Sequence, residues 1–330
     1  MSRRISKKMK FDKRKNLIAT ESKKSFGQRV ASELRRNWQL YVMVSVPIAF
    51  LIVFKYIPMY GVQIAFRDYK IGSGFLGSKW VGLKHFKKFL SYYKFKDILW
   101  NTLAISIYNL CAFPLPIVLA LLLNYVKPKH DAFKKTVQLV TYVPHFISTV
   151  VIVGMLIKFM DARSGMINMI VELFGGEAKN FLAYPEYFRH IYVWSGEWQG
   201  IGYASVLYIS ALASVPVDLH EAAIIDGANI RQRIWNVDLP CIMPTIAIKL
   251  ILACGNILSV GYSKIYLMQN NLNIETSEII STYVYKQGLG RSIPQYSYST
   301  AVNLFVAIVN LIMLLIVNKI TAKMSGNSLF

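Results

Sequence analysis

Apolar residues run along this chain in long unbroken stretches, without regular alternation with polar residues. A membrane-spanning helix needs roughly 20 mostly apolar residues, and six stretches reach about that length. The predicted spans are 39–58, 101–125, 137–159, 191–213, 242–261 and 299–318. Because the stretches are continuous, they do not fit the strands of a transmembrane barrel, in which apolar and polar residues alternate. The pattern therefore predicts an all-α integral membrane protein with six transmembrane helices.

One charged segment, residues 216–240, interrupts this pattern between the fourth and fifth predicted spans. Asp218 followed by Glu221 is close to a capping box and predicts the start of a helix. Gly227 suits a break or a left-handed turn after that helix. A second short helix is expected over "NIRQRIWNV", and it should end at Leu239 because the residue before a proline avoids helical geometry. The charged segment is thus predicted to form a helix–turn–helix outside the membrane.

The distribution of charge predicts the orientation of the spans. The chain has 330 residues, is 54% hydrophobic and carries a net charge of +21. Residues 1–38 hold thirteen Lys and Arg, a density typical of the cytoplasmic side. We interpret them as a basic cytoplasmic tail before a six-helix transmembrane domain at 39–330, and not as a cleavable signal peptide, because the first apolar stretch is long enough to span. Both termini, loop 126–136 and the charged segment then lie in the cytoplasm. No nucleic-acid partner is expected, since apart from the basic tail nothing in the sequence resembles a nucleic-acid recognition module.

No motif for catalysis, nucleotide binding or metal binding is found in the sequence. The phosphate-binding pattern G-x-x-x-x-G-K-[ST] is absent. The three cysteines lack the spacing of a disulfide framework or a zinc site, and the five histidines are scattered. These observations argue against an enzyme within the membrane. An ion-coupled transporter or channel is also disfavoured, because such proteins often carry acidic residues within their spans, and Glu197 is the nearest case here.

Polar and aromatic residues lie within or at the ends of the predicted spans. They include Tyr142, His145, Trp194, Glu197, Trp198, Asn256, Tyr262 and Asn303. By helical spacing, Tyr142, His145 and Ser148 should share one face, as should Ser299, Asn303 and Asn310. Two structural roles remain open. Trp and Tyr at span ends form interfacial belts, and Asn in spans bonds between helices. Lys249 either snorkels to the surface or lines the pathway.

The charged segment carries a pattern that resembles a known family. "EAAIIDGANIRQRIWNVDLPCIMP" is similar to the EAA signature of permease subunits in bacterial ABC importers of the sugar-importing, maltose-type branch. The matching residues are Glu221, Ala222, Ala223, Asp226, Gly227, Ala228, Leu239 and Pro240. The sequence departs from the signature at two positions. Ile234 stands where many members of the family have an aromatic residue, and Val237 stands where isoleucine is usual, but both positions remain apolar. "YGVQIAFRDYK", "NTLAISIY", "SEIISTYVYKQGL" and "YSYSTAVNLF" resemble the oligosaccharide or polysaccharide permeases, so the resemblance runs from about residue 40 onward.

The resemblance implies a type I ABC importer permease fold in a bacterial plasma membrane. It implies five kinds of partner: a second homologous permease subunit, two ATPase subunits, an extracytoplasmic solute-binding lipoprotein, membrane lipids, and an oligosaccharide or glycan fragment as substrate. A sugar needs hydrogen-bonding groups beside flat apolar faces, so the polar and aromatic residues of the spans named above are its candidate contacts. The charged segment would be the coupling helix that docks on an ATPase. ATP and Mg²⁺ would be bound by the ATPases, so this chain is expected to hold no cofactor and to catalyse no reaction. Segments 59–100 and 262–298 are expected to face the binding protein.

Overall fold

The computed structural model describes residues 26–326 and divides the chain into two compact units, Met1–Gln63 and Ile64–Phe330. Most of the predicted basic tail lies outside the described residues. In the first unit, every side chain from 38 to 60 is exposed, which suits a helix surrounded by lipid or by other subunits. The elements of this unit are α2 (Phe26–Arg36), α3 (Trp38–Leu51), the π-helical η1 (Ile52–Tyr56), α4 (Ile57–Met59) and the start of η2 (Tyr60–Phe66).

The second unit begins with a small antiparallel hairpin, in which β1 (Arg67–Asp68) pairs with β2 (Lys79–Trp80), and is otherwise helical in its described part. Its helices, in chain order, are η3 (Ile71–Ser73), α5 (Gly74–Gly77), α6 (Lys84–Leu90), α7 (Phe95–Ala112), α8 (Leu115–Asn124), η4 (Pro128–His130), α9 (Asp131–Tyr142), η5 (Val143–Phe146), α10 (Thr149–Phe159), α11 (Met166–Leu173), η6 (Phe181–Ala183), α12 (Pro185–Ala213), α13 (Val217–Ile225), α14 (Ile230–Arg233), the π-helical η7 (Ile234–Asp238), α15 (Leu239–Cys254), α16 (Tyr262–Met268), α17 (Ile274–Ser277), α18 (Ile280–Gly288) and α19 (Tyr296–Ser325).

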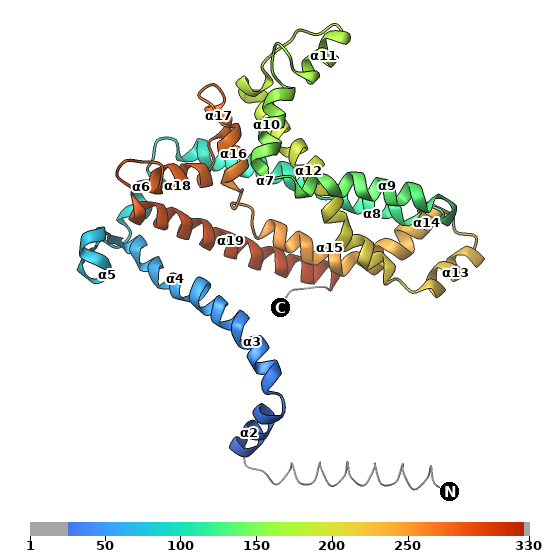
Figure 1. Cartoon of the computed structure of the whole chain (residues 1–330), viewed down its shortest axis with the longest axis horizontal. Helices are drawn as coiled ribbons and strands as arrows, with labels where there is room; N and C mark the ends of the chain where they lie inside the picture. Colours follow the sequence, from blue (N-terminus) through green and yellow to red (C-terminus); the bar gives the residue numbers. More distant parts are fainter. Residues whose placement is uncertain (1–25, 327–330) are drawn as a thin grey trace. The chain divides into compact units, whose positions relative to one another are not determined.

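Four helical runs among the described residues are long and apolar enough to cross a membrane: Trp38–Phe66, Phe95–Asn124, Ile230–Cys254 and Tyr296–Lys323. Two bent helix pairs raise the number to as many as six when each pair is counted as one span. This agrees with the six predicted spans. Within the second unit, α15 packs along α19, and α12 packs against both α8 and α9 (Figure 1).

The third predicted span, 137–159, is wrong as one continuous helix, because the runs Asp131–Phe146 and Thr149–Phe159 meet at 102°. Pro144 lies before the bend and has no N–H to donate to a helical bond. Ser148 starts the next helix by accepting a hydrogen bond from the Val151 N–H with its side chain. Gln199 of α12 donates to the carbonyl oxygen of Ile147, 3.0 Å away, and so satisfies a group that the bend leaves without a helical partner.

Three clusters of buried apolar side chains hold the second unit together. The first joins α7, α10, α12 and α16, the second joins α6, α7, α18 and α19, and the third joins α8, α12 and α15. Tyr208 and Leu212 of α12 pack in the third cluster with Ile117 and Leu121 of α8 and Ile242 of α15. The helices α7, α8, α12 and α15 are therefore fixed against one another by side chains distant in sequence.

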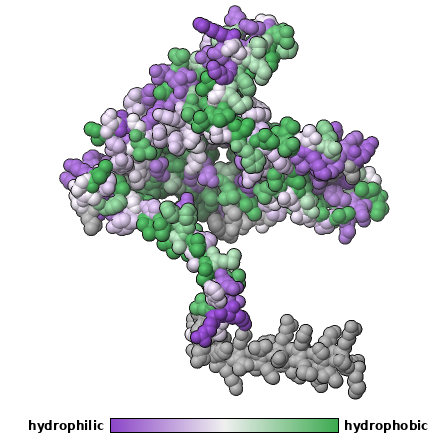
Figure 2. All heavy atoms as spheres, in the orientation of Figure 1, coloured by the Kyte–Doolittle hydropathy of each residue, from purple (hydrophilic) through white to green (hydrophobic). Residues whose placement is uncertain are grey.

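Many large apolar side chains of the second unit remain on its surface. They include Leu122, Leu139, Val140, Leu311 and Leu315 on helices of the spans. Figure 2 shows apolar side chains over much of the visible face of this unit, with hydrophilic ones at the end that holds α13 and α14 and also around α11. An exposed apolar surface of this extent is typical of contact with lipid or with partner subunits.

Candidate functional site

The charged segment forms a helix, a tight turn and a second helix, as predicted. The helix α13 ends in a Schellman motif, in which Ala228 N–H donates to the Ala223 carbonyl at 2.8 Å and Gly227 N–H donates to the Ile224 carbonyl at 3.0 Å. Gly227 has a φ of +77°, a backbone conformation that glycine adopts without strain. The predicted left-handed turn at Gly227 is confirmed.

Two details of the predicted helix boundaries are wrong. The helix α13 begins at Val217 with Pro216 at the N-cap position, so Asp218 is not a capping residue. A capping box instead starts α14, where the side chains of Asn229 and Gln232 each accept a hydrogen bond from the other's backbone N–H.

The second helix also does not end before Pro240. The run Ile230–Cys254 is helical throughout, with the π-helical turn η7 just before Leu239–Pro240. The wider π-turn changes the bonding pattern just before Pro240, which lies in the first turn of α15, where a missing N–H is tolerated. The charged segment is therefore joined to the fifth span by a continuous helix.

The residues that resemble the EAA signature lie on an exposed surface. Glu221, Ala222, Asp226, Gly227 and Pro240 are exposed, and Ala223, Ala228 and Leu239 are half-buried. Large apolar side chains accompany them, and Ile225 is 85% exposed and Trp235 is 70% exposed. This mixture of small, acidic and apolar side chains suits contact with a partner protein. That these residues bind an ATPase stays a prediction.

Behind this surface lies a buried polar group that the sequence reasoning missed. Asp238, which is 0% exposed, accepts a hydrogen bond on Oδ2 from the Tyr125 hydroxyl at 2.6 Å, and its Oδ1 lies 3.3 Å from His220 Nε2. The guanidinium of Arg233 lies over the Tyr125 ring, 5.4 Å from its centre. We call Asp238, Tyr125, His220 and Arg233 the Asp238 cluster. A carboxylate next to Leu239–Pro240 in an apolar stretch was the one available signal, because the partners Tyr125 and His220 are brought close only by folding.

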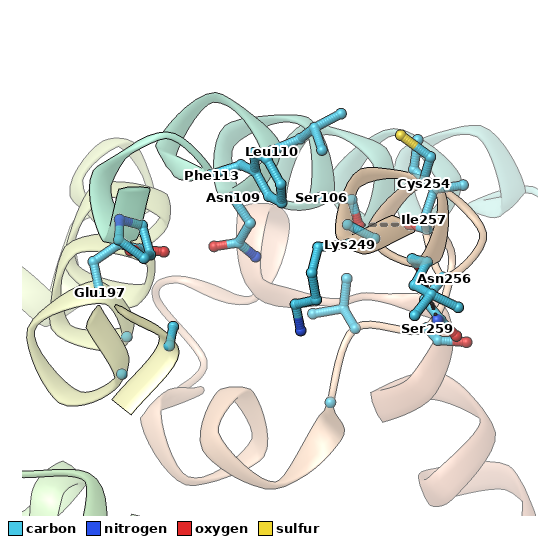
Figure 3. Close-up of a pocket in the computed structure, with 18 of the residues that line it drawn as sticks. Ser106, Asn109, Leu110, Phe113, Glu197, Lys249, Cys254, Asn256, Ile257 and Ser259 are labelled. Carbon is cyan, nitrogen blue, oxygen red and sulfur yellow. Dashed lines mark hydrogen bonds between the residues drawn. The ribbon is translucent and has the colours of Figure 1, made fainter. Parts of the chain in front are cut away.

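A cavity of about 580 Å³ opens between α7, α8, α12 and α15, within the second unit (Figure 3). Its polar lining includes Ser106 and Asn109 of α7, Glu197 of α12, Lys249 of α15 and Asn256 in the turn after α15. Figure 3 shows Asn109, Glu197 and Lys249 bordering the same open space. Glu197 and Asn256 are the two predicted sugar contacts that line this cavity, and Ser259 lines it as well. Lys249 also lines this cavity, and its place in a transport pathway stays a prediction.

The two aromatic candidates of α12 lie outside the cavity lining. Trp194 is 54% exposed and donates from Nε1 to the Tyr108 hydroxyl at 2.8 Å, and that hydroxyl is 2.9 Å from His190 Nδ1. Trp198 is 49% exposed. Neither residue lines the cavity. Their contact with a sugar stays a prediction.

The candidates of the third span and Tyr262 are also separated from the cavity. His145 stacks on Tyr203, with ring centres 3.9 Å apart, and Tyr262 stacks on Tyr285 at 4.8 Å. The bend falls between His145 and Ser148, so the helix face predicted for these two residues and Tyr142 does not exist. Tyr142, His145 and Tyr262 are not part of the cavity lining.

The predicted polar stripe on α19 is divided between two environments. Asn310 is buried, accepts a hydrogen bond from the Leu258 N–H at 3.0 Å, and donates to Ser259 Oγ at 2.7 Å. It therefore holds the turn that follows α15, which explains why the fifth helix ends at Cys254 and not at the predicted residue 261. Asn303 is exposed on α19 and lies outside the cavity lining.

This difference predicts opposite effects of two matched substitutions. Asn310→Leu should lower the melting temperature of the purified chain in detergent, because the buried Leu258 N–H loses its acceptor at a cost of about 1–3 kcal/mol. Asn303→Leu should leave that melting temperature close to the wild-type value. If Asn310→Leu melted at the same temperature as Asn303→Leu, the structural role of Asn310 would be contradicted.

A second, more polar cavity of about 430 Å³ lies where α7, α12 and α17 meet. Its lining includes Asp97, Asn101, Arg189 and Glu275. Arg189 donates to Asn101 Oδ1 at 2.7 Å, and Asn101 donates to the Glu275 carbonyl at 2.7 Å. Asp97 and Trp100 of segment 59–100 and Glu275 of segment 262–298 border this one cavity. That these segments face a binding protein stays a prediction.

Comparison with known proteins gives concordant matches. The family model described as "Binding-protein-dependent transport system inner membrane component" matches residues 112–326. The polygalacturonan/rhamnogalacturonan transport system permease protein YteP of Bacillus subtilis (strain 168) is 40% identical over 93% of this chain and 95% of its own length. Protein LplB of the same organism is 39% identical over 90% of this chain and 92% of its own length.

Solved structures give the same result for the fold. A chain in the crystal structure of a bacterial ABC transporter involved in the import of the acidic polysaccharide alginate is 36% identical, with a TM-score of 0.81 over 90% of this chain and 99% of that chain. A chain in the bacterial alginate ABC transporter in complex with an alginate pentasaccharide-bound periplasmic protein is 35% identical, with a TM-score of 0.81 over 91% of this chain and all of that chain.

Proposed function

This chain belongs to the family of binding-protein-dependent transport system inner membrane components, and we propose that it is the permease subunit of an ATP-driven importer of an oligosaccharide or glycan fragment. The observation that carries the proposal is the exposed charged segment. The charged segment follows the end of α12 and carries the EAA residues on both sides of the Schellman motif. Its second helix continues without a break into α15. Both α12 and α15 line the cavity, so force on the charged segment acts directly on two walls of the pathway.

The partners follow from the same arrangement. The charged segment docks on one of two ATPase subunits, which bind ATP and Mg²⁺ and hydrolyse the nucleotide. Binding of ATP would move the charged segment and switch the spans between inward-open and outward-open states, as alternating access requires. A second permease covers part of the exposed apolar surface of this chain, and Asn303 is a candidate contact on it.

We place both termini and the charged segment in the cytoplasm of a bacterial cell, on the basis of the basic tail. The second cavity then lies toward the outer surface, near segments 59–100 and 262–298. Its polar lining suits a binding protein that must dock and leave in every cycle, because transient interfaces are more polar than permanent ones.

The charges around the first cavity favour an acidic glycan. Lys249 has no carboxylate within ion-pair distance among the described residues. Glu197 lies within electrostatic reach of Lys264, which donates to the Tyr192 carbonyl at 3.1 Å behind the cavity wall. The Lys264 ammonium group therefore offsets the charge of the Glu197 carboxylate. Lys249 then remains as a cation for a sugar carboxylate. YteP and the alginate transporter, by their names, handle acidic polysaccharides.

Replacing Lys249 tests this substrate class. In the reconstituted importer, Lys249→Met should reduce uptake of a uronate oligosaccharide by about tenfold or more, because a hydrogen bond to a charged group contributes about 1.5–3 kcal/mol. Lys249→Arg should retain most of the uptake. Lys158→Met, at an exposed position at the end of α10 and outside the cavity lining, is the matched control. Wild-type uptake of the uronate by Lys249→Met would exclude this role.

The function itself is tested by purification of the complex. Affinity capture of this chain in mild detergent should recover a second permease, an ATPase and a binding lipoprotein, identified by mass spectrometry. Vesicles that contain the complex should take up an oligosaccharide only with ATP inside. Uptake without an ATPase would support an ATP-independent transporter instead.

A further inference from the structure

The Asp238 cluster connects three parts of the chain that are distant in sequence. His220 lies in α13, Asp238 lies at the junction of η7 and α15, and Tyr125 follows the last residue of α8. The chain already joins α13 to α12 and α15 covalently. The Asp238 cluster adds a contact to α8, which no short chain segment connects to the charged segment.

Each of these connections leads to a wall of the first cavity. The helices α7 and α8 contribute Ser106, Asn109 and Pro116 to its lining, and α15 contributes Lys249 and Leu252. The apolar contacts of Tyr208 and Leu212 with α8 and α15 lie in the same part of the unit. A displacement of α13 can therefore reach the walls of the cavity through the Asp238 cluster as well as through the backbone.

The Asp238 cluster is incompletely bonded in this conformation. Among the described residues, no hydrogen-bond donor reaches the buried Asp238 Oδ1, although His220 Nε2 lies 3.3 Å away. Within the same residues, the buried Arg233 Nε has no hydrogen-bond acceptor. A buried carboxylate oxygen and a buried guanidinium nitrogen without partners are unfavourable. A small shift of α13 that aligned His220 with Oδ1 would remove one of these penalties.

Tyr125 acts as a fixed donor in this arrangement. The Tyr125 hydroxyl donates to Asp238 Oδ2 at 2.6 Å and can keep this bond while His220 moves relative to Oδ1.

We propose that Tyr125, His220 and Asp238 form a latch that passes movement of α13 to α8 and α15, and that these three are positioning residues for coupling. The proposal rests on the proposed function, because it assumes that an ATPase moves the charged segment. It adds that coupling depends on side-chain contacts behind the docking surface, which the ATPase does not need to touch.

The first test uses the full chain alone in detergent and does not depend on an ATPase. Hydrogen exchange followed by mass spectrometry should show faster exchange of the α13 amides in Tyr125→Phe and His220→Gln than in wild type. His130→Gln changes an exposed histidine at the start of α9 and is the matched control, with exchange in α13 unchanged. Unchanged exchange of α13 in both latch variants would overturn the proposal.

The second test measures coupling in the reconstituted complex. Tyr125→Phe and His220→Gln should still co-purify with the ATPase and hydrolyse ATP at the basal rate. Sugar transported per ATP should fall by about fivefold or more, the lower end of typical coupling effects. The double variant Tyr125→Phe/His220→Gln should lose less than the product of the two single losses, because both residues act through Asp238.

Three results would count against the latch. Wild-type transport per ATP in both single variants would exclude a role in coupling, and loss of co-purification in both would indicate a purely structural role. Fully multiplicative losses in the double variant would indicate that the two residues act independently. Failure of the proposed function is distinguishable from all three, since the wild-type chain itself would then recover no ATPase.

Discussion

Substitution of Gly202 by valine should leave little folded protein in the membrane. Gly202 is buried in α12, and a Cβ atom added there would lie 2.2 Å from the Thr141 carbonyl oxygen and 2.4 Å from its carbonyl carbon. Both atoms belong to the backbone, so no side-chain rotation relieves the overlap. The end of α9 would have to move away from α12. We expect a loss of about 3 kcal/mol or more, the upper end of the cost of overpacking.

Size-exclusion profiles and melting temperatures of the detergent-extracted protein provide the measurement. Gly202→Ala should already lower the melting temperature, since the Cβ alone produces the overlap. Gly154→Ala is the matched control, because it lies in α10 of the same bent pair and a Cβ there meets nothing within 4 Å. A Gly202→Val protein that melted with the wild type would show that α9 and α12 do not approach each other as described.

The dependence of the third span on Gly202 shows why its bend could not be predicted from the sequence. Pro144 was visible as a weak point, but proline alone does not set a bend of 102°. The bend needs Gly202 to admit the Thr141 carbonyl and Gln199 to bond the Ile147 carbonyl, and both residues lie in α12. Such contacts between distant segments do not appear in hydrophobic periodicity, whereas the length and position of the spans do.

The charged segment divides in the same way between local and non-local causes. The turn at Gly227 was predictable because it depends on a few neighbouring residues and one backbone dihedral angle. The continuation through Pro240 was not, since it depends on a π-helical turn that no residue pattern signals. Asp238 was visible as a charge, but its partners Tyr125 and His220 could only be found in the fold.

Helical spacing was also insufficient to place the sugar candidates. Residues at helical spacing point to the same side of their helix, but the spacing does not show which other segment packs against that side. Asn310 faces the turn after α15, and Trp194 faces Tyr108, so both have structural partners. Glu197 and Asn256 line the cavity because α12 and the turn after α15 border it. Polar residues in spans thus predict the interior of the bundle better than they predict the pathway.

Gly227→Val should abolish sugar uptake while the chain still folds and inserts. The φ of +77° at this position costs an ordinary L-residue about 1–2 kcal/mol, and a β-branched residue more. A Cβ at Gly227 meets no described residue within 4 Å, so the substitution should not disturb the packing of the second unit. The Schellman motif would be lost and α13 would change its direction relative to α14. The measurements are ATPase co-purification and uptake at equal expression.

Gly175 supplies a control with the same backbone strain at a different place. It ends α11 in an equivalent motif, with a φ of +80°, and its Cβ would also meet nothing within 4 Å. Gly175→Val should therefore destabilise its own turn but leave ATPase co-purification intact. Gly227→Asn separates strain from shape, because asparagine tolerates the left-handed conformation. If the backbone angle is what the ATPase requires, Gly227→Asn retains much of the uptake that Gly227→Val loses. Wild-type uptake by Gly227→Val would instead show that the turn has no part in docking.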